Sequence, residues 1–323
     1  MLAGTSDRAG LAFTRYTGPE HASVWVADAD GSHARRLVAD GFGALLSPDG
    51  RRVAYYVPSK GLATPVLYVR RVAGGPPRRI GRVYAEWAPD GARLAASDRH
   101  ALFLVDVRTG TRRRLASGDT GRLSFAPGGG QLAFAGTNGK VGRAYRSDVF
   151  VVRLSDLAVT RLTHDGHSDE PAWGGRWIAY RSFHFGGEWS IGRLRLMRAD
   201  GSGNQMFARG DERTSRAQMG LDPLELSADG THLLACAAAE FGCPPVTFTV
   251  PDGKRYDLGR RLRTVARRSE LATAADLSRD GRAVLSSVSP FDTEDGGRVY
   301  AIPFRGGKPR LLVRDAATPS WAP

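Results

Sequence analysis

The stretch of sequence that decides the fold is Leu46-Ser-Pro-Asp-Gly-Arg-Arg-Val53-Ala54, which joins a large apolar residue to an aliphatic pair through a Pro-Asp-Gly turn. Proline presets φ at the second position of the turn, and aspartate bonds the backbone ahead of it. Glycine accepts positive φ before the next strand begins. The stretch therefore predicts a β-hairpin, in which Pro-Asp-Gly is a connector and carries no chemistry.

The same pattern recurs along the chain. A second clear copy is Trp87-Ala-Pro-Asp-Gly-Ala-Arg-Leu94-Ala95, and weaker copies begin at Phe125, Leu226 and Leu277. In all of these the apolar residue precedes the aliphatic residue by seven positions. The copy Trp173-Gly-Gly-Arg-Trp-Ile178-Ala179 has lost two residues of the turn, which fits a tighter, two-residue hairpin.

Each copy is followed by a second hairpin of alternating apolar and polar residues, such as Leu102-Phe-Leu-Val-Asp-Val-Arg-Thr-Gly110 leading to Arg113-Arg114-Leu115. Two hairpins make four antiparallel strands, and the copies lie roughly 40 to 50 residues apart, the period of a propeller blade. We therefore predict an all-β chain, residues 1–323, that forms a single β-propeller domain. Its six contiguous blades are expected at about 43–80, 84–116, 122–163, 169–208, 222–261 and 274–313.

A seventh blade is predicted from the two ends of the chain. Thr318-Pro-Ser-Trp-Ala-Pro323 contains one more apolar residue, Trp321, and breaks off where the turn would continue. Residues 10–37 contain the remaining strands of a blade. We expect residues 317–323 to add the innermost strand to this blade, which closes a seven-bladed ring and leaves no sheet edge at the seam.

The turn, the aliphatic-Ala-Phe/Tyr strand and the terminal Arg-Leu of each unit resemble the PD40 (WD40-like) repeats of TolB-like propellers, and they cover nearly the whole chain. The resemblance implies a bacterial, non-enzymatic scaffold that binds a protein or cell-envelope partner through its loop face, and it implies no cofactor. It also implies a periplasmic or extracellular protein whose leader is absent from this sequence. A cytoplasmic protein is the alternative, because Met1 to Thr14 lacks the apolar core of a secretory signal.

The chain is strongly basic, with 46 Lys and Arg against 33 Asp and Glu. Arginine pairs such as Arg35-Arg36 and Arg78-Arg79 fall on the last strand predicted for a blade, which is its exposed edge. Charge there discourages pairing with other molecules, so the excess argues only weakly for an anionic partner. We expect no nucleic-acid partner, keep an anionic glycan as a candidate, and expect no transmembrane segment because no long apolar run exists.

The richest group of chemically active side chains lies at the entry to the fourth complete blade. We predict ligand-binding residues here that are contributed by this entry and by the upper loop of the blade: His164, His167, Asp169, Glu170, Glu188 and Trp189. A divalent metal is a candidate ligand, because His164, His167 and His184 offer imidazole nitrogens beside carboxylates. The alternative is that these are ordinary solvated loop residues.

The second candidate function is carbohydrate-active. Some polysaccharide lyases, which this chain resembles in residue types but not in any motif, are seven-bladed propellers that use His, Tyr and Arg to abstract a proton beside a carboxylate. Here His184 or Tyr145 would take the proton, and Arg143 or Arg181 would neutralise the carboxylate of an acidic polysaccharide.

Cys236 and Cys243 are the only cysteines. They lie at the end of one predicted strand and the start of the next, across a single hairpin loop, and this placement permits a disulfide. A disulfide would indicate an oxidising compartment. Two buried free thiols are the alternative.

Overall fold

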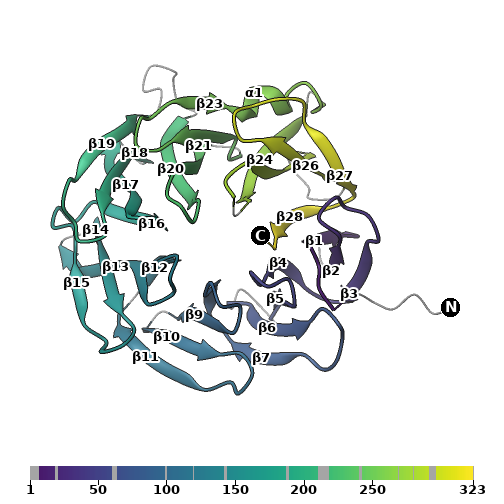
Figure 1. The fold of residues 1–323 in the computed structure, drawn as a ribbon, viewed down its shortest axis with the longest axis horizontal. Coiled ribbons are helices and arrows are strands. Elements are labelled where there is room, and N and C mark those ends of the chain that lie inside the picture. The colour runs from purple at the N-terminus through teal and green to yellow at the C-terminus, as the bar shows by residue number, and fades with distance from the viewer. Residues whose placement is uncertain are drawn as a thin grey trace.

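The computed structural model of the chain describes residues 7–18, 21–59, 64–98, 100–118, 120–141, 144–186, 189–209, 218–239, 242–267, 269–278, 280–290 and 296–322. These residues form β-strands almost throughout, and the sheets follow one another around a ring (Figure 1). The described residues include one helix, α1 (Leu258–Leu262). No helix in the described ranges has the length and apolarity needed to cross a membrane.

Five of the six sheets have four antiparallel strands each. One sheet combines both ends of the chain, in the order β28 (Ala317–Trp321), β1 (Leu11–Tyr16), β2 (Ala22–Ala27) and β3 (Arg35–Val38). The next contains β4 (Phe42–Leu46), β5 (Arg52–Val57), β6 (Val66–Arg71) and β7 (Arg78–Gly81). A third contains β8 (Tyr84–Trp87), β9 (Arg93–Ser97), β10 (Ala101–Asp106) and β11 (Arg112–Ser117).

The remaining sheets continue the series. The fourth contains β12 (Thr120–Phe125), β13 (Gln131–Val141), β14 (Ala144–Arg153) and β15 (Val159–Arg161). The eight-stranded sheet contains β16 (Ser168–Gly174), β17 (Trp177–Gly186), β18 (Trp189–Arg198), β19 (Gln205–Arg209), β20 (Gln218–Leu226), β21 (His232–Ala239), β22 (Pro245–Thr249) and β23 (Arg255–Asp257). The last contains β24 (Glu270–Leu277), β25 (Ala283–Pro290), β26 (Arg298–Pro303) and β27 (Arg310–Arg314). Within the eight-stranded sheet, β16–β19 and β20–β23 are two antiparallel groups whose strands pair with each other at a single parallel pair, Gly192 with Gly220.

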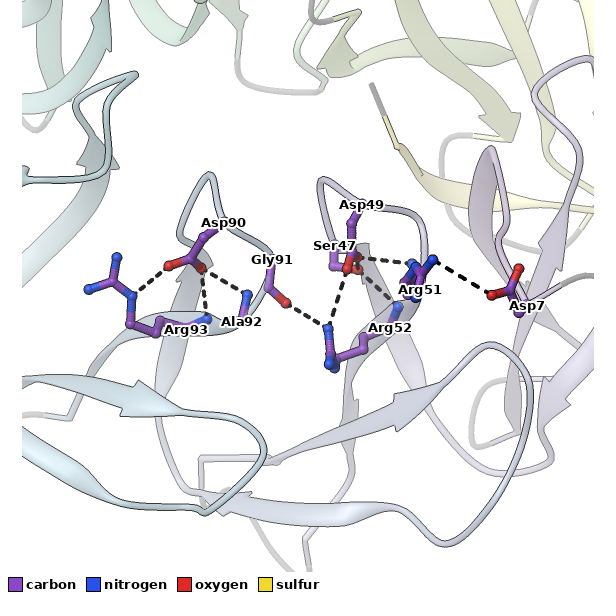
Figure 2. A network of polar contacts seen from close by, with 9 residues as sticks. All are labelled: Asp7, Ser47, Asp49, Arg51, Arg52, Asp90, Gly91, Ala92 and Arg93. Carbon is purple, nitrogen blue, oxygen red and sulfur yellow. Dashed lines mark hydrogen bonds and ion pairs between the residues drawn. The ribbon is translucent and has the colours of Figure 1, made fainter.

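The Pro-Asp-Gly turns make the side-chain and backbone hydrogen bonds that the sequence predicts (Figure 2). Asp49 accepts hydrogen bonds from the Ser47 hydroxyl at 2.6 Å and from the Arg51 backbone N–H at 3.0 Å. Gly50 has a φ of 68°, the left-handed region that glycine adopts without strain. The Arg52 guanidinium donates both to Asp49 at 3.4 Å and to the Gly91 carbonyl of the neighbouring turn at 3.1 Å. These turns therefore shape their own hairpins and also link adjacent sheets.

The spacing of seven positions in the repeat corresponds to direct cross-strand pairing. The partners are Leu46 with Val53, Trp87 with Leu94, Phe125 with Leu132, Leu226 with Leu233, and Leu277 with Val284. The shortened copy pairs Trp173 with Ile178. The prediction of hairpins from the repeat is therefore confirmed, because each pair faces across the first two strands of its group.

The apolar core lies between neighbouring groups of four strands. Among the described residues, buried apolar side chains form seven clusters, and each cluster draws on two adjacent groups. One of them packs Leu11 and Phe13 of β1 against Leu285 of β25 and Val299 of β26. Each fully buried side chain of this size contributes about 1.5–3 kcal/mol, so contact between successive groups stabilises the ring.

Candidate functional site

A cavity of about 1290 Å³ lies at the centre of the ring, and we call it the central cavity. Its walls come from the first strand of several groups, here named the inner strands: β4, β8, β12, β24 and β28. A smaller cavity of about 340 Å³ borders it and is lined by the turn prolines Pro48, Pro89 and Pro127. The central cavity is therefore at the opposite end of the inner strands from the Pro-Asp-Gly turns, on the loop face.

One wall of the central cavity is aromatic. Tyr56 and Tyr84 line this wall with their ring centroids 6.4 Å apart, and the ring of Phe42 packs against Tyr56 at 5.9 Å without lining the cavity. Burial raises the pKa of Tyr56 to about 12, although a hydrogen bond with the Ala85 backbone opposes the shift. Tyr84 is 64% exposed. Tyr56 is thus a fixed neutral surface, and Tyr84 is an accessible ring for contact with a ligand.

Glu86 lies on the same wall, two residues after Tyr84 on β8. Water in the cavity reaches its side chain, yet protein surrounds the group on the other sides. Burial raises the pKa of Glu86 to about 7; Arg122 opposes the shift and Asp276 adds to it. The Glu86 side chain has no hydrogen bond or ion pair with any other residue that the structure describes.

The first strands of several groups, including the inner strands β4 and β28 and also β16, contain bulges, which change the direction in which side chains point. Gly43, Glu170 and Thr318 have φ values of 62°, 50° and 44°, and each lies three residues before the large apolar residue of its strand. Positive φ is uncommon for any residue other than glycine, and such strain often occurs at functional sites. The bulge in β16 allows the Glu170 carboxylate to approach Arg122 of β12 to 3.5 Å.

A second charged group connects β16, β17 and β20. Arg181 donates to both oxygens of Asp169 at 2.7 Å and to Asp222 at 3.2 Å. All three side chains are less than a quarter exposed. Burial disfavours the charged guanidinium, but the hydrogen bonds and charges of Asp169 and Asp222 outweigh it and raise the pKa of Arg181. Arg181 is therefore already held by protein carboxylates.

A carboxyl pair, Glu225 and Asp276, lies at the smaller cavity. Both side chains accept the Leu277 backbone N–H, at 2.8 and 2.9 Å, and Asp276 also accepts the Trp321 backbone N–H at 2.7 Å. Burial raises the pKa of both groups, and Asp276 raises that of Glu225 further. Burial therefore favours a proton on this pair, and Asp276 binds the C-terminal strand through the Trp321 N–H.

The structure does not assemble the predicted histidines into a centre. His164 is exposed, His167 is held by the backbone oxygen of Asp165 at 2.8 Å and packs against Phe183, and His184 lies on β17. Among the described residues, no three His, Cys, Asp or Glu side chains are arranged to bind a metal ion. Metal binding at His164, His167 and His184 stays a prediction, without support from the described geometry.

The other predicted site residues divide into two sets. Asp169, Glu170 and Arg181 come together with Arg122 and Asp222 in the contacts above. Arg143 and Glu188 lie outside the described residues, as do the side chains of Tyr145 and Trp189, whose backbones pair in β14 and β18. The structure joins Cys236 to Cys243 by a disulfide.

Glu86, Arg122 and Tyr84 are absent from the set of residues predicted from sequence. The sequence does contain a pattern that could have identified Glu86. Glu86, Glu225 and Asp276 each immediately precede the large apolar residue of their repeat, a position where a small or apolar residue would complete an ordinary inner strand. Carboxyl groups at equivalent positions of three repeats indicate that they meet at the ring centre.

No family model matches the chain, and no curated protein matches it. Solved structures do. TolB from Acinetobacter baumannii aligns with a TM-score of 0.57 and 16% identity, over 97% of this chain and 82% of that one. The β-propeller domain of the Trilobed protease from Pyrococcus furiosus aligns with a TM-score of 0.66 and 10% identity, over 95% of this chain and 93% of that one. An oligogalacturonate lyase in complex with manganese aligns with a TM-score of 0.59 and 13% identity, over 95% of this chain and 85% of that one. At these identities the similarity establishes the fold, a TolB-like β-propeller.

Proposed function

We propose that this chain is a non-enzymatic propeller scaffold that binds a protein or cell-envelope partner through its loop face. The observation that carries the proposal is the central cavity, about 1290 Å³ in volume, with the exposed ring of Tyr84 on its wall. Accessible aromatic rings beside a cavity are the usual anchors of protein interfaces. The partner is expected to insert a segment between the inner strands.

The proposal includes a closed ring of seven blades. The eight-stranded sheet counts as two blades, because a single parallel pair, Gly192 with Gly220, joins its halves. Closure is supported by the pairing of Leu11 with Trp321 and by the cluster that packs Leu11 against Leu285. A closed ring provides a rigid rim for binding, because β28 pairs with β1 and joins the two ends of the chain in one sheet.

Export to an oxidising compartment, the periplasm or the cell exterior, is also part of the proposal. The disulfide between Cys236 and Cys243 supports it, since disulfides persist where thiols are not kept reduced.

The lyase alternative has weaker support. A fold similarity to an oligogalacturonate lyase does not transfer an activity at 13% identity. Arg181, one candidate for neutralising a uronate, is bonded to Asp169 on both carboxylate oxygens. Incubation with uronate-containing polysaccharides, with and without divalent metal, tests this alternative, and ultraviolet absorbance from an unsaturated product would favour it over the scaffold.

A photo-crosslinking amino acid at position 84 tests the scaffold proposal. The matched control places the same amino acid at Val159, which is 47% exposed and lies on β15, away from the central cavity. We expect a discrete crosslinked partner from position 84 alone. With that partner purified, Tyr84→Ala should weaken binding by at least about tenfold and Val159→Ala by less than about twofold. Equal crosslinking at both positions would contradict the proposal.

A further inference from the structure

The charged groups on the wall of the central cavity differ in how many hydrogen bonds and ion pairs they make with other residues. Asp98 accepts the backbone N–H groups of His100 and Ala101, both at 2.8 Å. Arg82 donates to the Ser59 hydroxyl at 2.8 Å and to the Thr64 carbonyl at 2.7 Å. These contacts fix the two side chains against the cavity rim.

Arg122 is engaged in the same way. It donates to the Leu224 carbonyl at 2.6 Å and lies 3.5 Å from the Glu170 carboxylate. Glu86 differs from all of these groups. Its carboxylate faces the central cavity from β8 without a hydrogen bond or ion pair to another described residue.

Glu86 also lies beside the aromatic wall. Side chains two residues apart on a strand share a face, so Tyr84 and Glu86 project from the same side of β8, and both are exposed. Tyr56 extends the wall at 6.4 Å from Tyr84. A carboxylate on the same wall as two tyrosine rings is complementary to a cation, which can gain an ion pair and cation–π contacts there.

We infer that Glu86, Tyr84 and Tyr56 form a receptor for a cationic side chain, lysine or arginine, carried by the segment that the partner inserts into the central cavity. This inference rests on the proposed function and adds the chemistry of recognition. Arg82 and Arg122 do not occupy the receptor, because their hydrogen bonds hold them elsewhere. The chain as a whole carries a formal charge of +13, so a receptor for a cation must depend on this local carboxylate.

The raised pKa of Glu86, about 7, agrees with a carboxylate that lacks a compensating charge. The groups that face it are Arg122 from β12, Asp276 from β24 and Glu225 from β20, with His100 and Asp98 farther along the same wall. A bound cation favours the ionised form of Glu86. Binding should therefore strengthen as the pH rises from about 6 to about 8.

Three short capped peptides test the inference: acetyl-Gly-Lys-Gly-amide, its arginine analogue, and its norleucine analogue, which keeps the aliphatic length without the charge. NMR titration of the intact protein at pH 8 measures each affinity. We expect the lysine or arginine peptide to bind at least about tenfold more tightly than the norleucine peptide. We expect Glu86→Gln to abolish that preference and its pH dependence. Asp90→Asn, at the turn end of the same hairpin, is the matched control and should preserve both.

Equal binding of the norleucine peptide, or a preference that survives in Glu86→Gln, would overturn the inference. Thermal unfolding of Glu86→Gln guards against a folding defect, which is not expected because Glu86 bonds to no described residue. Binding of the crosslinked partner to the two variants distinguishes a failure of this inference from a failure of the proposed function. If that partner binds Glu86→Gln as tightly as the natural sequence but loses affinity for Tyr84→Ala, the scaffold stands and the cation receptor falls.

Discussion

Replacing Asp276 with alanine tests how β28 is held in the ring. The Asp276 carboxylate accepts the Trp321 backbone N–H at 2.7 Å. It also bonds the Leu277 N–H, but that group keeps a second acceptor in Glu225 at 2.8 Å. The variant therefore leaves the Trp321 backbone N–H without its carboxylate acceptor. A donor that loses its acceptor costs about 1–3 kcal/mol, so we expect local opening of β28 to become easier by about 2–3 kcal/mol.

Hydrogen exchange followed by mass spectrometry measures this opening in peptides that cover residues 315–322. A change of about 2–3 kcal/mol corresponds to exchange that is roughly 30- to 150-fold faster. Asp90→Ala is the matched control, because its carboxylate bonds only Ala92 and Arg93 within its own hairpin. Exchange in Asp276→Ala within about threefold of the natural sequence would refute the role assigned to this carboxylate.

Three further predictions concern stability. Burial and Asp276 raise the pKa of Glu225 well above its ordinary 4.5, so the folded chain keeps a proton that the unfolded chain releases. This contribution to stability is lost as the pH rises from about 4.5 toward the raised value. In Glu225→Gln, the free energy of unfolding measured in urea should therefore fall less between pH 5 and pH 8 than in the natural sequence. An unchanged difference between the two pH values would count against the raised pKa of Glu225. Arg181→Met should lower the free energy of unfolding by about 3 kcal/mol because it leaves the Asp169 carboxylate without a cation, and Arg181→Lys should lower it by less because it keeps the charge; equal losses would argue against charge pairing as the cause. Replacing Cys236 and Cys243 with serine should lower the free energy of unfolding by about 2–3 kcal/mol, given a sequence separation of 7. A calorimetric unfolding midpoint identical to that of the natural protein would disprove this.

The hairpins could be predicted because their causes are local. Pro48, Asp49 and Gly50 each impose a backbone preference within a few residues, and Leu46 and Val53 then pair across the turn. The pairing of β28 with β1 joins distant parts of the chain, and its prediction rests on a different feature, the incomplete repeat at each end of the sequence.

The candidate site was not predictable in the same way. Glu86 and Arg122 belong to different repeats, and they meet only because the ring brings the inner strands together. Bulges such as the one at Glu170 shift the alternation by one residue, so a period of two cannot assign which side chains face inward. The predicted histidine group failed to assemble for the opposite reason. His164 and His167 are close in sequence, but the loop directs one to solvent and bonds the other to its own backbone.

The pairing of β28 with β1 has a consequence for synthesis of the protein. Leu11 and its partner Trp321 are 310 residues apart in the chain, so Leu11 leaves the ribosome long before Trp321 is made. At about 5–20 residues per second, β1–β3 wait roughly 15 to 60 seconds for the strand that covers them. During that interval β1 presents unpaired N–H and C=O groups to every other nascent chain. The nascent polypeptide, more than the finished ring, is therefore the species that depends on chaperones to avoid aggregation.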